Sequence, residues 1–124
     1  MKATLTDVMK ALPDFDELSN LSAEIADLMY RKLLLEKDIK VGEASVFKKC
    51  QTDPSLYQNG KPAPVTFIDN AYKFTGIENE LVPIRTQLAE IIAKLELARM
   101  KMDVYKNMMD IWRTLSANER SSSM

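Results

Sequence analysis

The chain contains no histidine and only one cysteine, Cys50. Without histidine, a protein cannot use histidine general bases or Cys–His nucleophile pairs, and most transition-metal sites are excluded. A lone cysteine cannot close an intramolecular disulfide or form a zinc site, and it is typical of a reducing compartment. Unpaired cysteine is usually a small buried side chain, which favours a packing role for Cys50 at a helix end. We therefore expect no cofactor and no metal site.

Other familiar functional signals are also missing from the sequence. It has no Gly-rich phosphate loop, nucleophile elbow or calcium loop. The acidic pair Glu78 and Glu80 lies at an expected helix start, where negative charge suits the helix dipole. No apolar run approaches the roughly 18 residues of a membrane span, and the first seven residues lack a signal-peptide core. These absences predict a cytoplasmic protein that is not an enzyme and has no small-molecule substrate.

The formal net charge is only −1 over 124 residues, a length that fits one domain. This total does not indicate a strongly basic nucleic-acid binder or a polybasic membrane binder. The distribution is uneven, because residues 1–30 carry two basic and six acidic side chains, whereas residues 31–61 carry seven and four. The chain thus has an acidic leading arm and a mildly basic middle.

With three glycines and five prolines among many helix formers, the composition favours long helices. The strongest pattern is an apolar series whose steps alternate between four and three residues without a slip. Its members are Ile77, Leu81, Ile84, Leu88, Ile91, Leu95, Ala98, Met102, Tyr105, Met109 and Trp112. This heptad stripe predicts a long helix that buries one seam against a partner helix.

A second periodic stretch runs from Leu18 to Cys50, with Ser19 or Ser22 as the expected cap. Its series is Leu18, Leu21, Ile25, Leu28, Lys32, Leu35, Ile39, Gly42, Val46 and Lys49. Glycine in the interior of this helix indicates either the close approach of another helix or a bend, and both alternatives remain open.

Residues 51–76 form the expected connection between the two long helices. Asn59-Gly60 is a turn signal, although its flanks do not alternate well enough to predict a β-hairpin. A short helix is expected from Thr66 to Thr75, capped by Thr66 and closed by Gly76.

The start of the second long helix has two alternatives. A cap at Thr75 would place Pro83 deep in the helix and require a kink. A cap at Asn79 would place Pro83 at the fourth helical position, where its missing N–H has no helical partner anyway. We favour the second alternative, or a bend near Pro83.

The predicted fold is all-α: a long antiparallel helical hairpin, coiled-coil-like, with a short N-terminal helix and a short helix at the hairpin tip. The N-terminal helix should span Leu5 to Leu12, with Thr4 or Thr6 as its cap. The expected segments are an arm (1–17), a long helix (18–50), the tip connection (51–76), a long helix (77–115) and a disordered tail (116–124).

A two-helix hairpin has no enclosed core, so surplus apolar positions beside its seam argue for a homo-oligomer. The predicted oligomer interface is Leu97, Met100, Val104, Met108, Ile111 and Trp112. The methionines among these residues and beside them allow another interpretation, an adaptable binding surface, although packing within a helical assembly is the commoner role.

Lysines and aromatic residues alternate near the expected tip, a combination that sequence-tolerant binding of single strands uses. The candidate nucleic-acid-binding residues are Lys48, Lys49, Lys61, Lys73 and Tyr72. In the alternative interpretation, the aromatic side chains form the core of a small cap and the lysines are simply solvated. Copies of the chain in a ring would multiply a weak patch.

The layout of the chain resembles one family. The segments that carry the resemblance are Tyr30-Arg31-Lys32-Leu33-Leu34-Leu35-Glu36-Lys37, a turn near Tyr57 to Gly60, Ile68-Asp69-Asn70-Ala71-Tyr72-Lys73, and Ile111-Trp112-Arg113. Over roughly residues 22–113 this helical plan is similar to that of the recombination mediators of T4-type phages (the UvsY type). The resemblance implies a ring-forming protein that binds single-stranded DNA and assists recombinase loading, with a recombinase or a single-strand-binding protein as partner.

A different class of function is compatible with the same helices. A structural or adaptor protein, such as a phage assembly factor, a chaperone or an inhibitor, would use the apolar stripes to engage a protein partner. Such a protein would be indifferent to nucleic acid.

Overall fold

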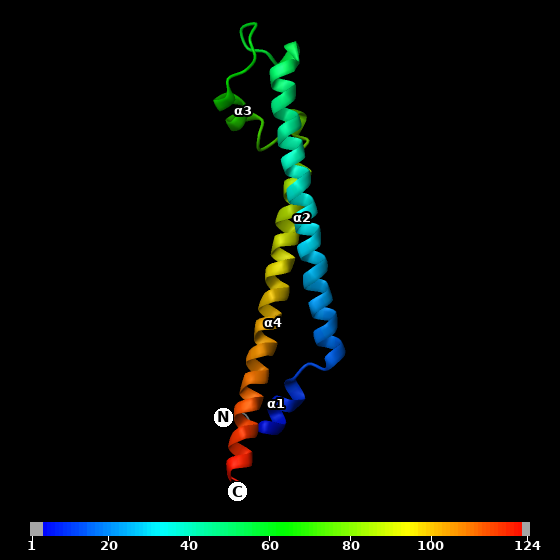
Figure 1. Cartoon of the computed structure of the whole chain (residues 1–124), viewed down its shortest axis with the longest axis vertical. Coiled ribbons are helices and arrows are strands. Elements are labelled where there is room, and N and C mark those ends of the chain that lie inside the picture. The colour runs from blue at the N-terminus through cyan, green and yellow to red at the C-terminus, as the bar shows by residue number, and fades with distance from the viewer. Residues whose placement is uncertain (1–3, 123–124) are drawn as a thin grey trace. The chain divides into compact units, whose positions relative to one another are not determined.

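The computed structural model describes residues 4–122 and confirms the predicted all-α fold (Figure 1). The two long helices of the antiparallel hairpin are α2 (Phe15–Thr52) and α4 (Val82–Ser122). The short helices are α1 (Leu5–Ala11) at the N-terminus and α3 (Val65–Ala71) at the tip. No strand occurs within residues 4–122. Residues 1–3 of the predicted arm and 123–124 of the predicted tail lie outside the described residues.

Two compact units share these helices. The terminal unit contains α1, α2 up to Leu28, and α4 from Lys94 onward, while the tip unit is Met29–Ala93. Both long helices therefore contribute to both units, and α3 belongs to the tip unit alone.

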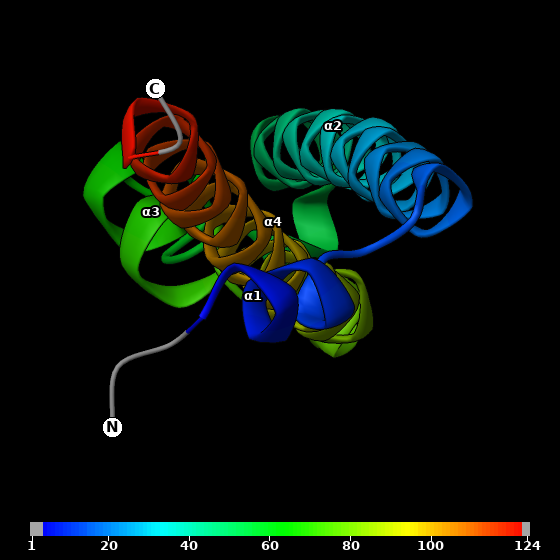
Figure 2. The ribbon, with the colours of Figure 1, turned by 90° about the horizontal axis from the view of Figure 1, so that it is seen from below.

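In the terminal unit, α2 and α4 pack through the predicted seam. Leu21 and Leu28 of α2 and Leu95 and Ala98 of α4 are buried. The later seam residues are half-buried: Met102, Tyr105, Met109 and Trp112. The helix α1 lies alongside the end of α4, as Figures 1 and 2 both show. Leu5 shares a shallow hollow there with Ser116, Glu119 and Arg120.

Two N-terminal caps of the terminal unit use local side chains. The carboxylate of Asp14 accepts a hydrogen bond of 2.7 Å from the backbone N–H of Glu17. This cap starts α2 at Phe15, so the predicted start at Leu18 with a serine cap was wrong. In α1, Thr4 and Asp7 exchange hydrogen bonds of 3.2 Å in a capping box, which selects Thr4 from the two expected caps.

The tip unit encloses a small core drawn from several segments. Its buried members are Val46, Cys50, Ala63, Ile68 and Leu81, with Phe47, Leu56, Tyr72, Ile77 and Ile84 packed against them. Figure 1 shows α3 beside the C-terminal part of α2 in this unit. On α2, the buried seam continues from Val46 to Cys50 and not to Lys49 as the predicted series has it. A step of four residues keeps the side chain on the core side of the helix, and Lys49 is exposed.

Gly42 marks a close approach, which decides between the two alternatives for this residue. A Cβ at Gly42 would collide with the Cδ2 atom of Leu81, the buried residue just before α4. The missing side chain therefore makes room for a core leucine of the tip unit.

The connection contains two turns with clear local causes. Asp53 caps the 3₁₀ turn η1 (Pro54–Leu56) by accepting hydrogen bonds from the backbone and hydroxyl of Ser55, at 3.0 and 2.8 Å. Asn59 and Gly60 have φ values of 55° and 74°, and Gln58 and Lys61 exchange backbone hydrogen bonds across them. This is the two-residue turn that Asn-Gly favours, and it forms without long alternating flanks.

The short tip helix and the start of the second long helix differ from the prediction. The helix α3 begins at Val65 behind Pro64 and ends at Ala71, so Thr66 is not its cap and Thr75 is not its end. The 3₁₀ turn η2 (Ile77–Asn79) follows, with left-handed backbone at Glu78 and Asn79. The helix α4 therefore starts only at Val82, and Pro83 lies in its first turn, where proline is tolerated without a kink.

The tail prediction was also wrong for the described residues. The helix α4 continues past Leu115 to Ser122, so residues 116–122 are helical. Polar composition alone suggested an end here, but Ser, Asn and Glu are compatible with a helix that is already nucleated.

Candidate functional site

An exposed apolar row on α4 is the most distinct surface of the terminal unit. Leu97, Met100, Val104 and Ile111 are 68, 63, 50 and 49% exposed, respectively, and we call these four residues the α4 strip. Their spacing of three, four and seven residues places them on one side of the helix, because 3.6 residues make a turn. The buried seam residues Leu95 and Ala98 belong to another side of the same helix. The strip thus remains uncovered in the single chain.

Two residues of the predicted oligomer interface do not belong to the strip. Trp112 is half-buried in the seam, and its indole Nε1 is enclosed without a hydrogen-bond partner among the described residues. Met108 is also half-buried, at the border between strip and seam. The sequence assigned both to the interface because apolar residues surround α4 on more than one side.

The four candidate lysines of the tip unit, Lys48, Lys49, Lys61 and Lys73, are all exposed. They come from three segments: α2, the Asn59-Gly60 turn and the turn after α3. Adjacent residues of a helix point about 100° apart, so Lys48 and Lys49 leave α2 in different directions.

Tyr72, the fifth candidate residue, packs against the tip core. Its ring meets that of Phe67 edge-on, with centroids 5.7 Å apart. Tyr72 is half-buried, whereas Phe67 and Phe74 are 37 and 64% exposed. The cap interpretation therefore holds for Tyr72, whereas Phe67 and Phe74 remain exposed.

Arg85 organises the tip, and the sequence reasoning missed it. Its guanidinium bonds the carboxylate of Glu43 on α2 at 2.5 Å and the carbonyl oxygens of Phe74 and Lys73 at 2.7 and 3.0 Å. The same group lies 4.8 Å from the centroid of the Phe74 ring. Five donors in a planar fork allow one arginine to serve all of these partners. Glu43 and Arg85 are 42 positions apart, so no local pattern could have paired them.

Acidic side chains offset part of the positive charge around Lys73. One hollow beside α3 is lined by Lys40, Glu43, Ala44, Phe47, Ile68, Asp69 and Lys73. Glu43 already pairs with Arg85, and Asp69 lies one turn before Lys73 on the same short segment. This hollow carries mixed charge rather than the continuous basic groove that would track a nucleic-acid backbone.

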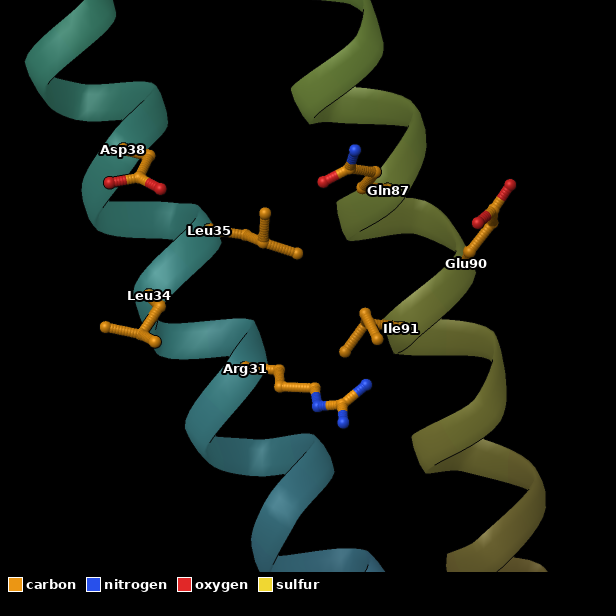
Figure 3. Close-up of a pocket in the computed structure, with 7 residues that line it drawn as sticks. All are labelled: Arg31, Leu34, Leu35, Asp38, Gln87, Glu90 and Ile91. Carbon is orange, nitrogen blue, oxygen red and sulfur yellow. The ribbon is translucent and has the colours of Figure 1, made fainter.

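A second hollow of the tip unit opens over the seam between α2 and α4 (Figure 3). Leu35 and Ile91 point toward one another across it, and Arg31 extends from α2 toward α4. The carboxylate of Glu90 points away from α2, so it does not converge with Asp38.

Chemical groups for catalysis do not gather in residues 4–122. No three Cys, Asp or Glu side chains there are placed to hold a metal ion, and no polar or charged side chain is buried. Cys50 is fully buried, and this burial raises the pKa of its thiol, which disfavours the nucleophilic thiolate. The candidate site of this chain is therefore a set of surfaces.

Comparisons with protein-family models, curated proteins and solved structures find no match for this chain. The resemblance to phage recombination mediators stays a hypothesis. A search of the described helices for a length and hydropathy sufficient to cross a membrane finds none.

Proposed function

We propose that this chain is a non-enzymatic helical protein that forms homo-oligomers and acts through protein–protein contacts, as a structural or adaptor protein. The α4 strip carries this proposal. Four large apolar side chains in one row, each about half exposed or more, form the kind of patch that marks an interaction site. Leucine and methionine in such a row can bury their side chains against another helix.

A second apolar surface lies on α2 within the tip unit. Tyr30, Leu33, Leu34 and Val41 are 62, 61, 41 and 60% exposed, respectively. An adaptor needs more than one contact surface, and this patch supplies another besides the α4 strip. The buried free thiol of Cys50 supports a reducing compartment, the cytoplasm, as the place of action.

The test of this proposal replaces an apolar side chain of the strip by a charged one. Val104→Glu should shift the purified protein from oligomer to monomer in light scattering after size exclusion. The dissociation constant should rise at least about tenfold, because an unpaired charge is costly to bury. Helix content measured by circular dichroism should stay unchanged, since Val104 is exposed in the single chain.

Ala117→Glu is the matched control, because it adds the same charge at an exposed position of α4 away from the strip. This variant should remain oligomeric. A monomeric wild-type protein at every accessible concentration would contradict self-association, and an unchanged Val104→Glu oligomer would show that the strip is not the contact.

A second candidate function is that of a recombination mediator which binds single-stranded DNA and works with a recombinase or a single-strand-binding protein. One observation favours it: four exposed lysines share the tip unit with the exposed rings of Phe67 and Phe74. Stacking of bases on open rings and lysine contacts to phosphates are the usual means of binding single strands. Repetition of the tip in a homo-oligomer would raise the avidity of a weak patch.

Anisotropy of a labelled single-stranded oligonucleotide at low salt tests this candidate. Replacing Lys48, Lys49, Lys61 and Lys73 by Gln should abolish binding, and the wild type should lose affinity steeply as salt rises. A control with Lys10, Arg99, Lys106 and Arg113 replaced by Gln removes the same charge from the terminal unit and should keep binding. Absence of wild-type binding at low salt would reject the DNA candidate and leave the protein-contact proposal standing.

A further inference from the structure

Charged residues flank the α4 strip in an ordered way. On one flank, Glu96, Asp103 and Asp110 recur every seven residues, and all three are exposed. On the other flank, Lys94 and Lys101 are exposed and also seven residues apart. With about 100° per residue, the two sets lie on opposite sides of the strip. The acidic set runs along the whole strip, whereas the basic set flanks only its N-terminal part, because Met108 and Leu115 continue that edge. The strip therefore has one acidic edge and one edge that is basic beside Leu97 and Met100.

These edges distinguish the two ways in which a second copy can pack on the strip. In a parallel pair of helices, the acidic edge of each copy faces the basic edge of the other, and Glu96 comes near Lys101 of the second copy. In an antiparallel pair, like edges meet, so that the acidic residues of one copy face those of the other, with Glu96 near Asp110. Opposite charges at such edges set the orientation of helix pairs, and like charges disfavour it.

Asn107 adds an independent indication of register. It is exposed and falls at the strip position between Val104 and Ile111, where the heptad spacing expects an apolar residue. In a parallel pair in register, each Asn107 faces its own counterpart, and the two amides can hydrogen-bond to one another. Another register would bury each amide against an apolar side chain without a partner, so Asn107 favours the in-register pair.

From these observations we infer that two copies of this chain pair in parallel and in register through the α4 strip. This rests on the self-association in the proposed function and adds the partner, the orientation and the register. The pair buries Leu97, Met100, Val104 and Ile111 against their own counterparts. Its edges are closed by Glu96 of each copy and Lys101 of the other.

Disulfide trapping tests the orientation directly. Leu97→Cys and Ile111→Cys are prepared as separate variants and oxidised alone and as an equimolar mixture. In the parallel pair, each variant alone forms a covalent dimer, because each position faces itself. In an antiparallel pair centred near Val104, neither variant cross-links alone, and the mixture yields a disulfide between positions 97 and 111. The wild type serves as control, since its only thiol, Cys50, is buried.

Charge reversal at Glu96 gives a second test, because it should change the dimer affinity in opposite directions for the two orientations. In the parallel pair, Glu96→Lys places lysine against Lys101 of the other copy and should weaken the dimer about threefold to thirtyfold. In the antiparallel pair, the same change relieves acidic repulsion and strengthens the dimer. Lys101 itself is left unchanged, because it lines a hollow of its own chain with Glu17 and Glu24.

The outcomes separate the inference from the proposed function. A dimer in light scattering whose cross-link joins positions 97 and 111, or which Glu96→Lys strengthens, overturns the parallel arrangement and leaves self-association intact. A wild type that stays monomeric overturns both. Homotypic cross-links at both positions, together with a weaker Glu96→Lys dimer, support the parallel pair.

Discussion

The tip unit and the terminal unit use the same two helices in different ways. In the tip unit, α2, the connection, α3 and the start of α4 enclose a core around Leu81, and Arg85 fastens the turn after α3 to Glu43. In the terminal unit, α2 and α4 share a seam, and α4 leaves an apolar row exposed. In both units, apolar side chains are buried where several segments meet and exposed where none lies over them, as on the α4 strip and at Tyr30, Leu33, Leu34 and Val41 of α2. Where none does, the surface remains available to another molecule.

The largest expected difference in stability between the units comes from a leucine-to-alanine substitution made once in each of them. Leu81→Ala should lower the free energy of unfolding by about 2–5 kcal/mol, because Leu81 is 2% exposed and fills the space beside Gly42. Leu97→Ala should change it by less than about 0.5 kcal/mol, since Leu97 is 68% exposed. Urea denaturation followed by circular dichroism at low protein concentration measures both. Equal losses would remove the distinction between an enclosed and an open unit.

The next effect concerns the polar anchor of the tip. Arg85→Ala should cost about 1–3 kcal/mol, because Glu43 and two carbonyl oxygens lose a charged donor in a partly buried place. Arg113→Ala is the matched change in the terminal unit. It should cost almost nothing, since Arg113 and Asp110 are 71 and 70% exposed and 3.4 Å apart. A neutral Arg85→Ala in the same denaturation assay would mean that the apolar core alone holds the tip.

A smaller loss of stability is expected at alkaline pH, and it arises from Cys50 in the tip unit. Burial raises the pKa of the Cys50 thiol in the folded chain, so the unfolded chain ionises first. The resulting stability is fully present below the ordinary thiol pKa of about 8.5 and is lost as pH rises above it. Denaturation at pH 8 and pH 10 should show a loss in the wild type that Cys50→Ala reduces. Identical losses in both proteins would assign the effect to other groups.

The smallest effect is expected at acidic pH, with one carboxylate in each unit. Hydrogen bonds from Thr4 lower the pKa of Asp7, and hydrogen bonds from Ser55 lower that of Asp53. The stability that these two carboxylates contribute is present above the ordinary carboxyl pKa and is lost as pH falls through their lowered pKa values. Carboxyl titration by NMR should find both values low, and Thr4→Ala should raise the pKa of Asp7 alone. If Asp53 moved as well, the two caps would not be local.

Local sequence signals mark more of the caps and turns than we predicted from them. Asp14 and Glu17 have the spacing of a capping pair, yet the apolar series that begins at Leu18 outweighed it. Asn59-Gly60 was predicted as a turn, and only its two-residue hairpin form was not, because its flanks do not alternate. The start of α4 could not be read in this way. Left-handed backbone is uncommon for a glutamate such as Glu78, and this turn leads directly to Leu81, which packs in the tip core beside Gly42.

Periodicity alone predicts the two long helices, their seam and the surplus of apolar residues on α4, because heptad spacing places side chains on a fixed side of a helix whatever it packs against. Every residue of the series from Ile77 to Trp112 is indeed buried or half-buried. Folding of the whole chain brings Arg85 to Glu43 and packs Tyr72 against the tip core. These outcomes depend on contacts between residues distant in the chain, for which the sequence carries no periodic signal.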